Sequence, residues 1–339
     1  GSSWTEVNNL NTARAYLAGA GTSTSAIGFG GFHPPNNQDA LTESWDGSSW
    51  TETADLNTGR YGLGGSGSST SALAWGGYTG TAATGATEEW NGVTPIGAWS
   101  TDASLNKARS YVGGAGTLTS TLVFGGYSGN PAPQYDAQTE SYNGSSWTEV
   151  NDLNTARNQL GGLGTATNAL AFGGQPFTGA TESWNGSTWT EVNDFNTTRK
   201  YASGAGIYTS GLAIGGATPP GPGTASGKTE SWDGTNWTEV GDLNTAREQQ
   251  ASNGTTNTLA IAFAGYLGPP GITGKTEDWN GNNWVEVADL NTAAQATGAA
   301  SNVSAATGAF SIGGYAPGIV AATEKFASST NLTKTIDTD

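Results

Sequence analysis

The stretch that decides the fold reads TESYNGSSWTEVNDLNTAR over residues 139–157. Nearly the same residues recur along the whole chain, and a fixed period of this kind is the signature of a repeat architecture. A Gly pair, or Ala-Gly in one unit, closes an apolar run seven times, at spacings of 42 to 49 residues. A Thr-Glu pair follows each run, and a Trp opens the next segment. The chain is therefore a tandem array of one unit.

Each unit contains four short runs that are typical of β-strands. The third and fourth runs are usually joined by Asn-Gly or Asp-Gly, as at Asn143-Gly144 and Asp233-Gly234. These dipeptides tolerate positive φ and are the strongest short signal for a hairpin. The first run is rich in Gly and Ala, which suits strands that crowd a central axis. Four antiparallel strands per unit predict a propeller blade, because a ring of blades protects the edges that a lone sheet would expose.

The two ends of the chain are out of phase with the repeat. The chain begins with Gly1-Ser2-Ser3-Trp4-Thr5-Glu6-Val7, which is the end of a unit, and its last unit lacks this Trp segment. We therefore predict an all-β, seven-bladed β-propeller over residues 1–330, closed by the N-terminal strand, and a C-terminal tail over 331–339. The start within a blade and the absence of an initiator Met suggest a processed chain or a fragment of a longer protein. The expected blades span approximately residues 12–56, 58–105, 107–153, 155–195, 197–243, 245–290, and 292–330 together with 1–10.

The order of these marks resembles the kelch repeat: R-x-Y, an apolar strand, Gly-Gly, a variable loop, T-E-x-W, N-G, W-T-E and L-N-T-A-R. The resemblance covers everything except the short tail, and it implies a seven-bladed propeller of the kelch and galactose-oxidase type. The near-identical blades also resemble Trp- and Asn-Gly-rich propellers of bacteriophage structural proteins and bacterial surface proteins. The chain departs from the pattern at Ala264, which replaces the first Gly, and at Ala294, which replaces the Arg.

The composition excludes several classes of partner. The net charge is −16, whereas binding to a nucleic-acid backbone normally needs a basic face. An acidic membrane surface is disfavoured for the same reason, and no apolar run is long enough to span a membrane. The chain has no Cys, so a disulfide framework and thiol chemistry are excluded. We expect no nucleic-acid partner and no membrane insertion.

Residues present in nearly every unit are expected to serve the blade itself. Six Arg start the first strands, at Arg14, Arg60, Arg109, Arg157, Arg199 and Arg247. They could form a ring of cations that grips an anion, but six Arg accompanying seven Thr-Glu pairs favour Arg–Glu pairing within the scaffold. Glu324 in the last unit should then lack its Arg. The repeated Trp are interpreted as packing residues first and as platforms for sugar stacking second.

Residues that change from unit to unit are not required by the fold of the blade. One variable set follows the Arg, and the other is the loop after the Gly pair. Strand direction alternates within a blade, so both sets should emerge at one rim and at the funnel mouth. Aromatic and amide side chains on loops over a rigid frame are typical of recognition surfaces. The candidate ligand-binding residues are Phe32, His33, Tyr61, Tyr78, Tyr111, Tyr127, Tyr135, Gln159, Phe177, Tyr201, Gln249, Tyr266 and Tyr315. Neutral drift in exposed loops is the alternative.

Catalytic chemistry has little support in the sequence. Copper chemistry of the galactose-oxidase kind needs a Cys-Tyr link and two His, but the chain has no Cys and only His33. A Ser-His-Asp set would have to use His33, and a zinc site is similarly unsupported. Paired carboxylates for glycoside hydrolysis stay open, with Asp136 and Glu248 as the off-pattern acids on the candidate face. We predict no catalytic residues, no metal and no cofactor.

The leading functional hypothesis is a non-catalytic binding propeller. It would act outside a cell or on a virion and recognise a protein or a glycan through the face that carries the variable loops. The second hypothesis is a structural assembly module, such as a fibre or decoration protein, with other surface or virion subunits as partners. A glycan-active enzyme is the third.

Overall fold

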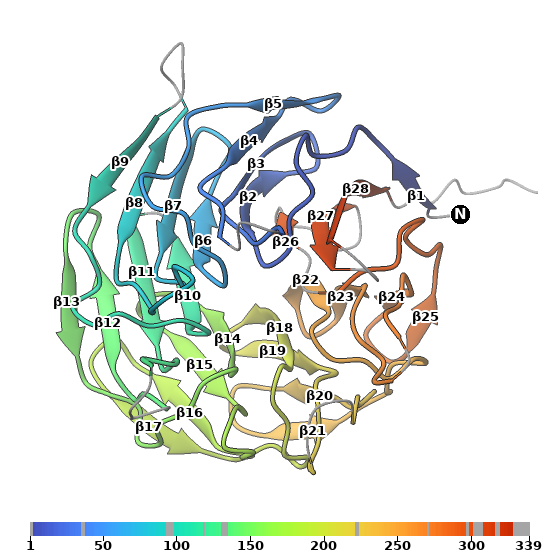
Figure 1. The fold of residues 1–339 in the computed structure, drawn as a ribbon. Helices are drawn as coiled ribbons and strands as arrows, with labels where there is room; N and C mark the ends of the chain where they lie inside the picture. The colour runs from blue at the N-terminus through green and yellow to red at the C-terminus, as the bar shows by residue number, and fades with distance from the viewer. Residues whose placement is uncertain are drawn as a thin grey trace, which may run out of the picture.

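The computed structural model describes residues 3–34, 38–92, 98–117, 119–129, 135–220, 224–269, 271–295, 298–300, 308–315 and 319–327. These residues form 28 strands, which are arranged as four-stranded antiparallel sheets around a central axis (Figure 1). The predicted β-propeller is thereby confirmed. The predicted tail, residues 331–339, lies outside the described residues.

Six sheets are each made of four consecutive strands. The first two sheets contain β2 (Ala18–Thr22), β3 (Ser25–Phe29), β4 (Thr42–Trp45) and β5 (Trp50–Glu52), then β6 (Gly64–Gly67), β7 (Ser71–Trp75), β8 (Thr87–Asn91) and β9 (Ala98–Asp102). The next two contain β10 (Gly113–Thr117), β11 (Ser120–Phe124), β12 (Thr139–Tyr142) and β13 (Trp147–Val150), then β14 (Gly161–Gly164), β15 (Ala169–Phe172), β16 (Thr181–Trp184) and β17 (Trp189–Val192). The last two contain β18 (Ser203–Ile207), β19 (Ser210–Ile214), β20 (Thr229–Trp232) and β21 (Trp237–Glu239), then β22 (Ala251–Thr256), β23 (Leu259–Phe263), β24 (Thr276–Trp279) and β25 (Trp284–Glu286).

The remaining sheet is composite, because it joins the two ends of the chain. β26 (Gly298–Ala300), β27 (Gly308–Tyr315) and β28 (Ile319–Ala327) supply three strands, and β1 (Ser3–Glu6) pairs with β28 on the outer side. β27 and β28 have 8 and 9 residues, whereas the corresponding strands of the six other sheets have 4 or 5. Their register shifts between Ile312 and Gly314. This sheet also has Ala294 where the others have Arg.

The prediction of a seven-bladed propeller is therefore corrected to six regular blades and one composite sheet in the described residues. A regular blade, defined by four consecutive strands and a buried Arg–Glu pair, is present six times in the described chain. The composite sheet completes the ring between the regular blades of β2 and β22, where its inner strand β26 contacts both. Its irregularity has a physical reason, since it needs strands from both termini and lacks the arginine that anchors every other unit.

The inner strands crowd the axis, and this explains their Gly content. β2, β6, β10, β14, β18, β22 and β26 lie nearest the centre and contact one another in ring order (Figure 1). A side chain at Gly161 would overlap the ring of Phe172. That ring packs between blades, 5.3 Å from the Phe195 ring and 5.4 Å from the Trp237 ring. Small residues on the inner strands therefore make room for aromatic layers between neighbouring blades.

The Trp of the fourth strands belong to these layers. The five whose side chains are described are only 5–6% exposed: Trp50, Trp147, Trp189, Trp237 and Trp284. Trp237 in β21 donates its indole N–H to the Thr181 hydroxyl of the preceding blade at 3.0 Å, and three other Trp make the same bond. The interpretation of these Trp as sugar-stacking platforms is wrong, because their faces are covered by protein.

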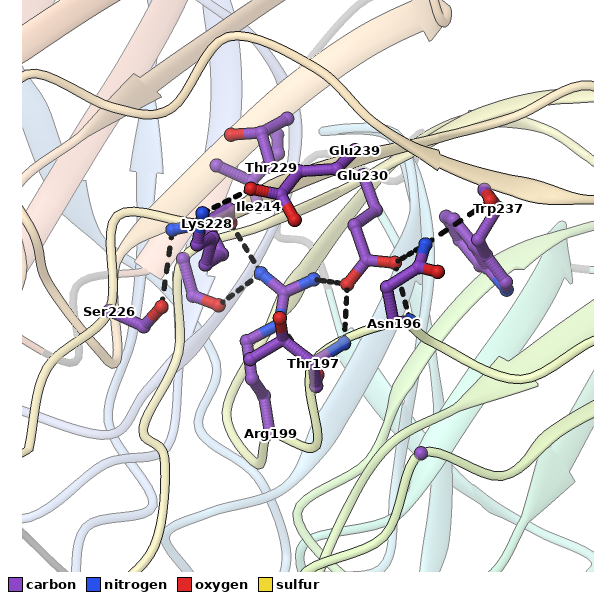
Figure 2. A network of polar contacts seen from close by, with 12 residues as sticks. Asn196, Thr197, Arg199, Ile214, Ser226, Lys228, Thr229, Glu230, Trp237 and Glu239 are labelled. Atoms are coloured by element: carbon purple, nitrogen blue, oxygen red, sulfur yellow. Dashed lines mark hydrogen bonds and ion pairs between the residues drawn. The ribbon is translucent and has the colours of Figure 1, made fainter.

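Each regular blade contains one fully buried Arg–Glu pair (Figure 2). In the blade of β18–β21, Arg199 Nη2 lies 2.9 Å from Glu230 Oε1, and both residues are 0% exposed. Arg199 Nη1 donates to the carbonyl oxygens of Gly215 and Lys228. Glu230 accepts from the backbone N–H of Asn196 at 2.8 Å and of Thr197 at 3.3 Å. The predicted Arg–Glu pairing is confirmed in all six blades, at 2.7–3.1 Å.

The same arginines also join neighbouring blades through their backbone. Arg157 donates its N–H to the Asp136 carbonyl at 2.9 Å and accepts from the Gly126 N–H at 2.9 Å, and both partners belong to the preceding blade. Its side chain meanwhile binds Glu182 of its own blade. The carbonyls of Arg60, Arg109, Arg199 and Arg247 accept the corresponding bond from the preceding blade. At the composite sheet, Ala294 keeps this backbone link with Gly265, but its methyl side chain cannot form an ion pair with a glutamate.

Glu324 therefore occupies the glutamate position without an arginine, as predicted. It is 1% exposed, and it accepts from the Asn291 N–H at 2.7 Å and the Thr292 N–H at 2.8 Å. Burial raises the pKa of Glu324, although these hydrogen bonds oppose the rise. The folded protein thus binds this proton more tightly than the unfolded chain does. Its contribution to stability is present at low pH and is lost as pH rises through the raised pKa.

Substituting Ala294→Arg should supply the missing cation. We expect the variant to gain about 1–3 kcal/mol of unfolding free energy near neutral pH, because a hydrogen bond to a charged group stabilises by about that much. The gain should be smaller at about pH 3.5, because protonation of Glu324 removes the charge that the new Arg would pair with. Urea unfolding at both pH values measures it, with Ala294→Met as a control of similar length and no charge. A variant that is no more stable than the Met control at neutral pH would contradict this expectation.

Candidate functional site

The two variable sets of the sequence meet at one rim. In every sheet, the residue after the Arg position forms an antiparallel bridge with the residue after the Gly pair. These bridges join Ala15 to Phe32, Tyr61 to Tyr78, Ser110 to Tyr127, Asn158 to Gln175, Lys200 to Ala217, Glu248 to Tyr266 and Gln295 to Tyr315. The backbone thus places the start of each first strand beside the loop between the second and third strands. Variable side chains from both sets share one face of the propeller.

The central opening on this face is lined by the residue two positions after each Arg. The cavity measures about 420 Å³. We call the following set the mouth ring: Tyr16, Gly62, Tyr111, Gln159, Tyr201 and Gln249. Each regular blade contributes one member. The first strands bring the six positions together because they converge on the axis (Figure 1).

The mouth ring has a left-handed backbone. Its five members other than Gly have φ between 51° and 56°, and Gly62 has φ of 61°. This conformation costs a non-Gly residue roughly 1–2 kcal/mol. It lets backbone groups bond across blades: Gly62 N–H donates to the Tyr16 carbonyl at 3.0 Å, and Tyr201 N–H donates to the Gln159 carbonyl at 3.0 Å. Gly62 shows that the fold accepts Gly here, so Tyr and Gln adopt this conformation at a backbone cost that Gly would avoid. Such strain is characteristic of ligand sites.

The three tyrosines of the mouth ring approach one another. Burial raises the pKa of Tyr201, and Tyr111, Glu248 and Tyr16 add to the rise. Burial likewise raises the pKa of Tyr111, with contributions from Tyr16 and other tyrosines. The phenols are therefore neutral at physiological pH and retain their O–H donors. The cavity offers aromatic faces, hydroxyl groups and amides together.

A cluster of aromatic rings continues from the mouth onto the rim of the first two blades. The Tyr61 ring lies 6.4 Å from Tyr16, 5.5 Å from Phe32 and 5.6 Å from Tyr78, between ring centroids. Tyr16 also has Tyr315 among its electrostatic neighbours. Tyr315 is 41% exposed at the start of the composite sheet's second loop. Three predicted residues, Phe32, Tyr61 and Tyr78, thus form one contiguous surface with the mouth ring.

A second cavity opens beside the mouth ring between the third, fourth and fifth blades. It measures about 270 Å³, and we call it the side pocket. Its lining residues are Tyr111, Tyr127, Tyr135, Asn158, Gln159, Gln175 and Lys200. Tyr111 and Gln159 line both cavities. Phe177 lies at its edge, with its ring centroid 5.2 Å from the Lys200 ammonium nitrogen.

Two predicted residues lie apart from these cavities. His33 Nδ1 is hydrogen-bonded to Asp39 within its own loop, so the ring is held by a neighbouring carboxylate. Tyr266 is bridged through its backbone to Glu248 and Ile272. Neither residue lines the mouth cavity or the side pocket.

The two off-pattern acids are both buried. Asp136 is 3% exposed and forms an ion pair with Lys107 at 2.6 Å. Burial alone would raise the pKa of Asp136, but the Lys107 hydrogen bond and the Gln138 N–H hold it below its ordinary value. Glu248 is 1% exposed and belongs to a different blade. Within the described residues, no group of three or more His, Asp or Glu is arranged to hold a metal ion.

Sequence reasoning left three important residues out of the candidate set. Tyr16, Gln175 and Lys200 line the cavities, although their positions belong to the variable sets. A signal was present for Tyr16: its counterpart in the second blade is Gly62, and a Gly that alternates with Tyr indicates positive φ. The environment of Lys200 depends on contacts between blades, which a single unit does not reveal.

Comparisons with known proteins add no family assignment. A scan against protein-family models found no match to this chain. A search of curated proteins also found no significant match. The propeller fold therefore stands on the structure alone, and the resemblance to kelch repeats and to bacteriophage propellers has no support from these searches. In the part of the chain that the structure describes, there is no helix that could cross a membrane.

The strained backbone of the mouth ring can be tested by comparing two substitutions at one position. Tyr201→Gly and Tyr201→Ala remove the same phenol, but only Gly adopts φ of 56° without penalty. We expect the Gly variant to be more stable than the Ala variant by about 1 kcal/mol. Urea unfolding measures the difference. The same pair at Tyr61, which is not among the positive-φ residues, is the control, and there Ala should be at least as stable as Gly. Equal stability of the two Tyr201 variants would contradict the strain.

Proposed function

We propose that this propeller is a non-catalytic binding module that recognises a glycan at its mouth ring. The observation that carries the proposal is the presence of three Tyr and two Gln at left-handed positions around a cavity of about 420 Å³. Flat phenol rings stack on the apolar faces of sugar rings, and amide and hydroxyl groups bond their hydroxyls. The cavity lies within the roughly 300–1,000 Å³ range of pockets for small ligands. Its position at the meeting of six inner strands supplies a rigid frame.

The proposal also includes the place where the protein acts and a second class of partner. Action outside a cell or on a virion rests on the resemblance of the sequence to surface propellers. A protein partner is the second candidate, because Tyr111, Leu267 and Tyr315 are exposed hydrophobic residues on the loop face, at 39%, 39% and 41%. Exposed apolar side chains on one face are a feature of protein-contact surfaces.

A glycan array tests the mouth ring directly. The variant is Tyr111→Gly/Tyr201→Gly, because Gly62 shows that Gly keeps the backbone of this ring. We expect the wild-type protein to bind one class of glycan and the double variant to lose at least about tenfold in affinity, since each stacked ring contributes about a factor of ten or less. Ile207→Ser is the matched control, because Ile207 is 50% exposed on the hairpin between β18 and β19 at the opposite face. Binding that survives in the double variant would contradict the proposal, and so would an array with no glycan bound. The latter result would favour the protein partner.

A further inference from the structure

One cation in this protein stands apart from all the others. The structure describes ten basic side chains, and nine of them form ion pairs with carboxylates within 4.0 Å. Lys200 is the tenth. No carboxylate of the described residues lies within that distance of its ammonium group, although the chain carries 28 acidic residues. The net charge of −16 makes an isolated cation in a cavity unexpected.

The surroundings of Lys200 are aromatic. The residue is 7% exposed, and its ammonium nitrogen lies 5.2 Å from the Phe177 ring centroid and 5.1 Å from that of Tyr201. Contact with ring faces stabilises a cation in part. A buried ammonium group with no carboxylate within 4.0 Å is nevertheless unfavourable. Binding of an anion beside Lys200 would therefore lower the free energy of the site. The other positions after the Arg carry no cation: they are Ala15, Tyr61, Ser110, Asn158, Glu248 and, in the composite sheet, Gln295.

The side pocket also contains unused hydrogen-bonding capacity. The amide oxygens of Gln159 and Gln175 are buried, and neither has a hydrogen-bond partner among the described residues. Both side chains line the pocket together with Lys200. An amide offers an acceptor at one end and donors at the other, so each can serve the hydroxyl groups of a ligand. Tyr111, Tyr127 and Tyr135 supply rings to the same space.

We propose that the side pocket is an acidic-sugar subsite in which Lys200 binds the carboxylate of a uronate or a related sugar acid. The proposal rests on the glycan function of the mouth ring, because Tyr111 and Gln159 line both cavities and connect them. A volume of about 270 Å³ suits one ring of an oligosaccharide rather than a chain. The aromatic rings and amides then hold the sugar ring, while Lys200 favours a sugar with a carboxylate over a neutral sugar.

The test compares two pairs of sugars that differ at one carbon. D-glucuronate and D-galacturonate carry a carboxylate where D-glucose and D-galactose carry a hydroxymethyl group. Ligand-observed NMR titration measures the dissociation constant of each. We expect at least one uronate to bind about tenfold more tightly than its neutral counterpart, which is the usual effect of one charge-assisted hydrogen bond. Lys200→Met should abolish this preference, and Lys200→Arg should largely retain it. Lys228→Met is the matched control, because Lys228 forms an exposed ion pair with Glu239.

The outcomes separate the subsite from the proposed function. Equal binding of both sugars of each pair, or a preference that persists in Lys200→Met, would overturn the subsite. In that case a positive glycan array would leave the function of the mouth ring intact. A uronate preference that is lost in Lys200→Met would support the subsite even if the array showed no glycan. In that case only the proposed function of the mouth ring would be contradicted. Absence of binding in both assays would overturn both. Thermal unfolding of each variant shows whether it is folded.

Discussion

The buried pair between an arginine and a glutamate is the interaction on which the rest of this propeller depends. Each pair is buried, and backbone groups bind the arginine Nη1 atoms and the glutamate oxygens, although the Nε of five of the six arginines has no hydrogen-bond partner among the described residues. Burying two charges is unfavourable unless geometry and hydrogen bonds compensate. Here the glutamate also holds the connection that enters its blade, and the arginine backbone binds the preceding blade. One residue therefore bonds its own blade through its side chain and the preceding blade through its backbone.

This arrangement explains why the loop face can vary. Because the Arg, the Gly pair and the Glu are held by contacts within the scaffold, the residues just after them are not required for stability. Those residues lie together on one rim, as the bridges from Ser110 to Tyr127 and from Asn158 to Gln175 show. A ligand site on such a frame loses little conformational entropy on binding. The strained mouth ring and the isolated Lys200 are the places where this protein departs from what its scaffold needs.

Much of the fold could be predicted from the sequence, because the period, the Asn-Gly turns and the Gly-rich inner strands act locally. The Arg–Glu pairs were predictable since the two residues recur together, and the missing pair at Glu324 followed from Ala294. The composite sheet departs from a regular blade for reasons that the repeat does not contain, namely strands from both termini and a register shift near Ile312. The burial of Trp237 was favoured in advance, but its bond to Thr181 crosses between blades and could not be read from one unit.

The candidate site was predictable only in part. Alternating strand direction placed the variable residues on one face, and the structure brings Tyr111, Gln159, Tyr201 and Gln249 to the central cavity. The left-handed backbone of these residues was not predicted, because Tyr and Gln have no local preference for positive φ. The isolation of Lys200 depends on which carboxylates lie nearby in three dimensions. His33 stood out as the only histidine, yet it is bonded to Asp39 and lies away from both cavities.

The most direct test of this account is the unfolding free energy of Arg199→Met in urea, compared with that of Lys228→Met. Both substitutions remove one cation that pairs with a glutamate of the same blade, but Arg199 is fully buried and the Lys228 side chain is 36% exposed. Removing one partner of a buried pair typically costs about 3–5 kcal/mol, whereas an exposed pair contributes about 1 kcal/mol or less. The account predicts this difference. Equal and small losses in the two variants would contradict the central role of the buried pair.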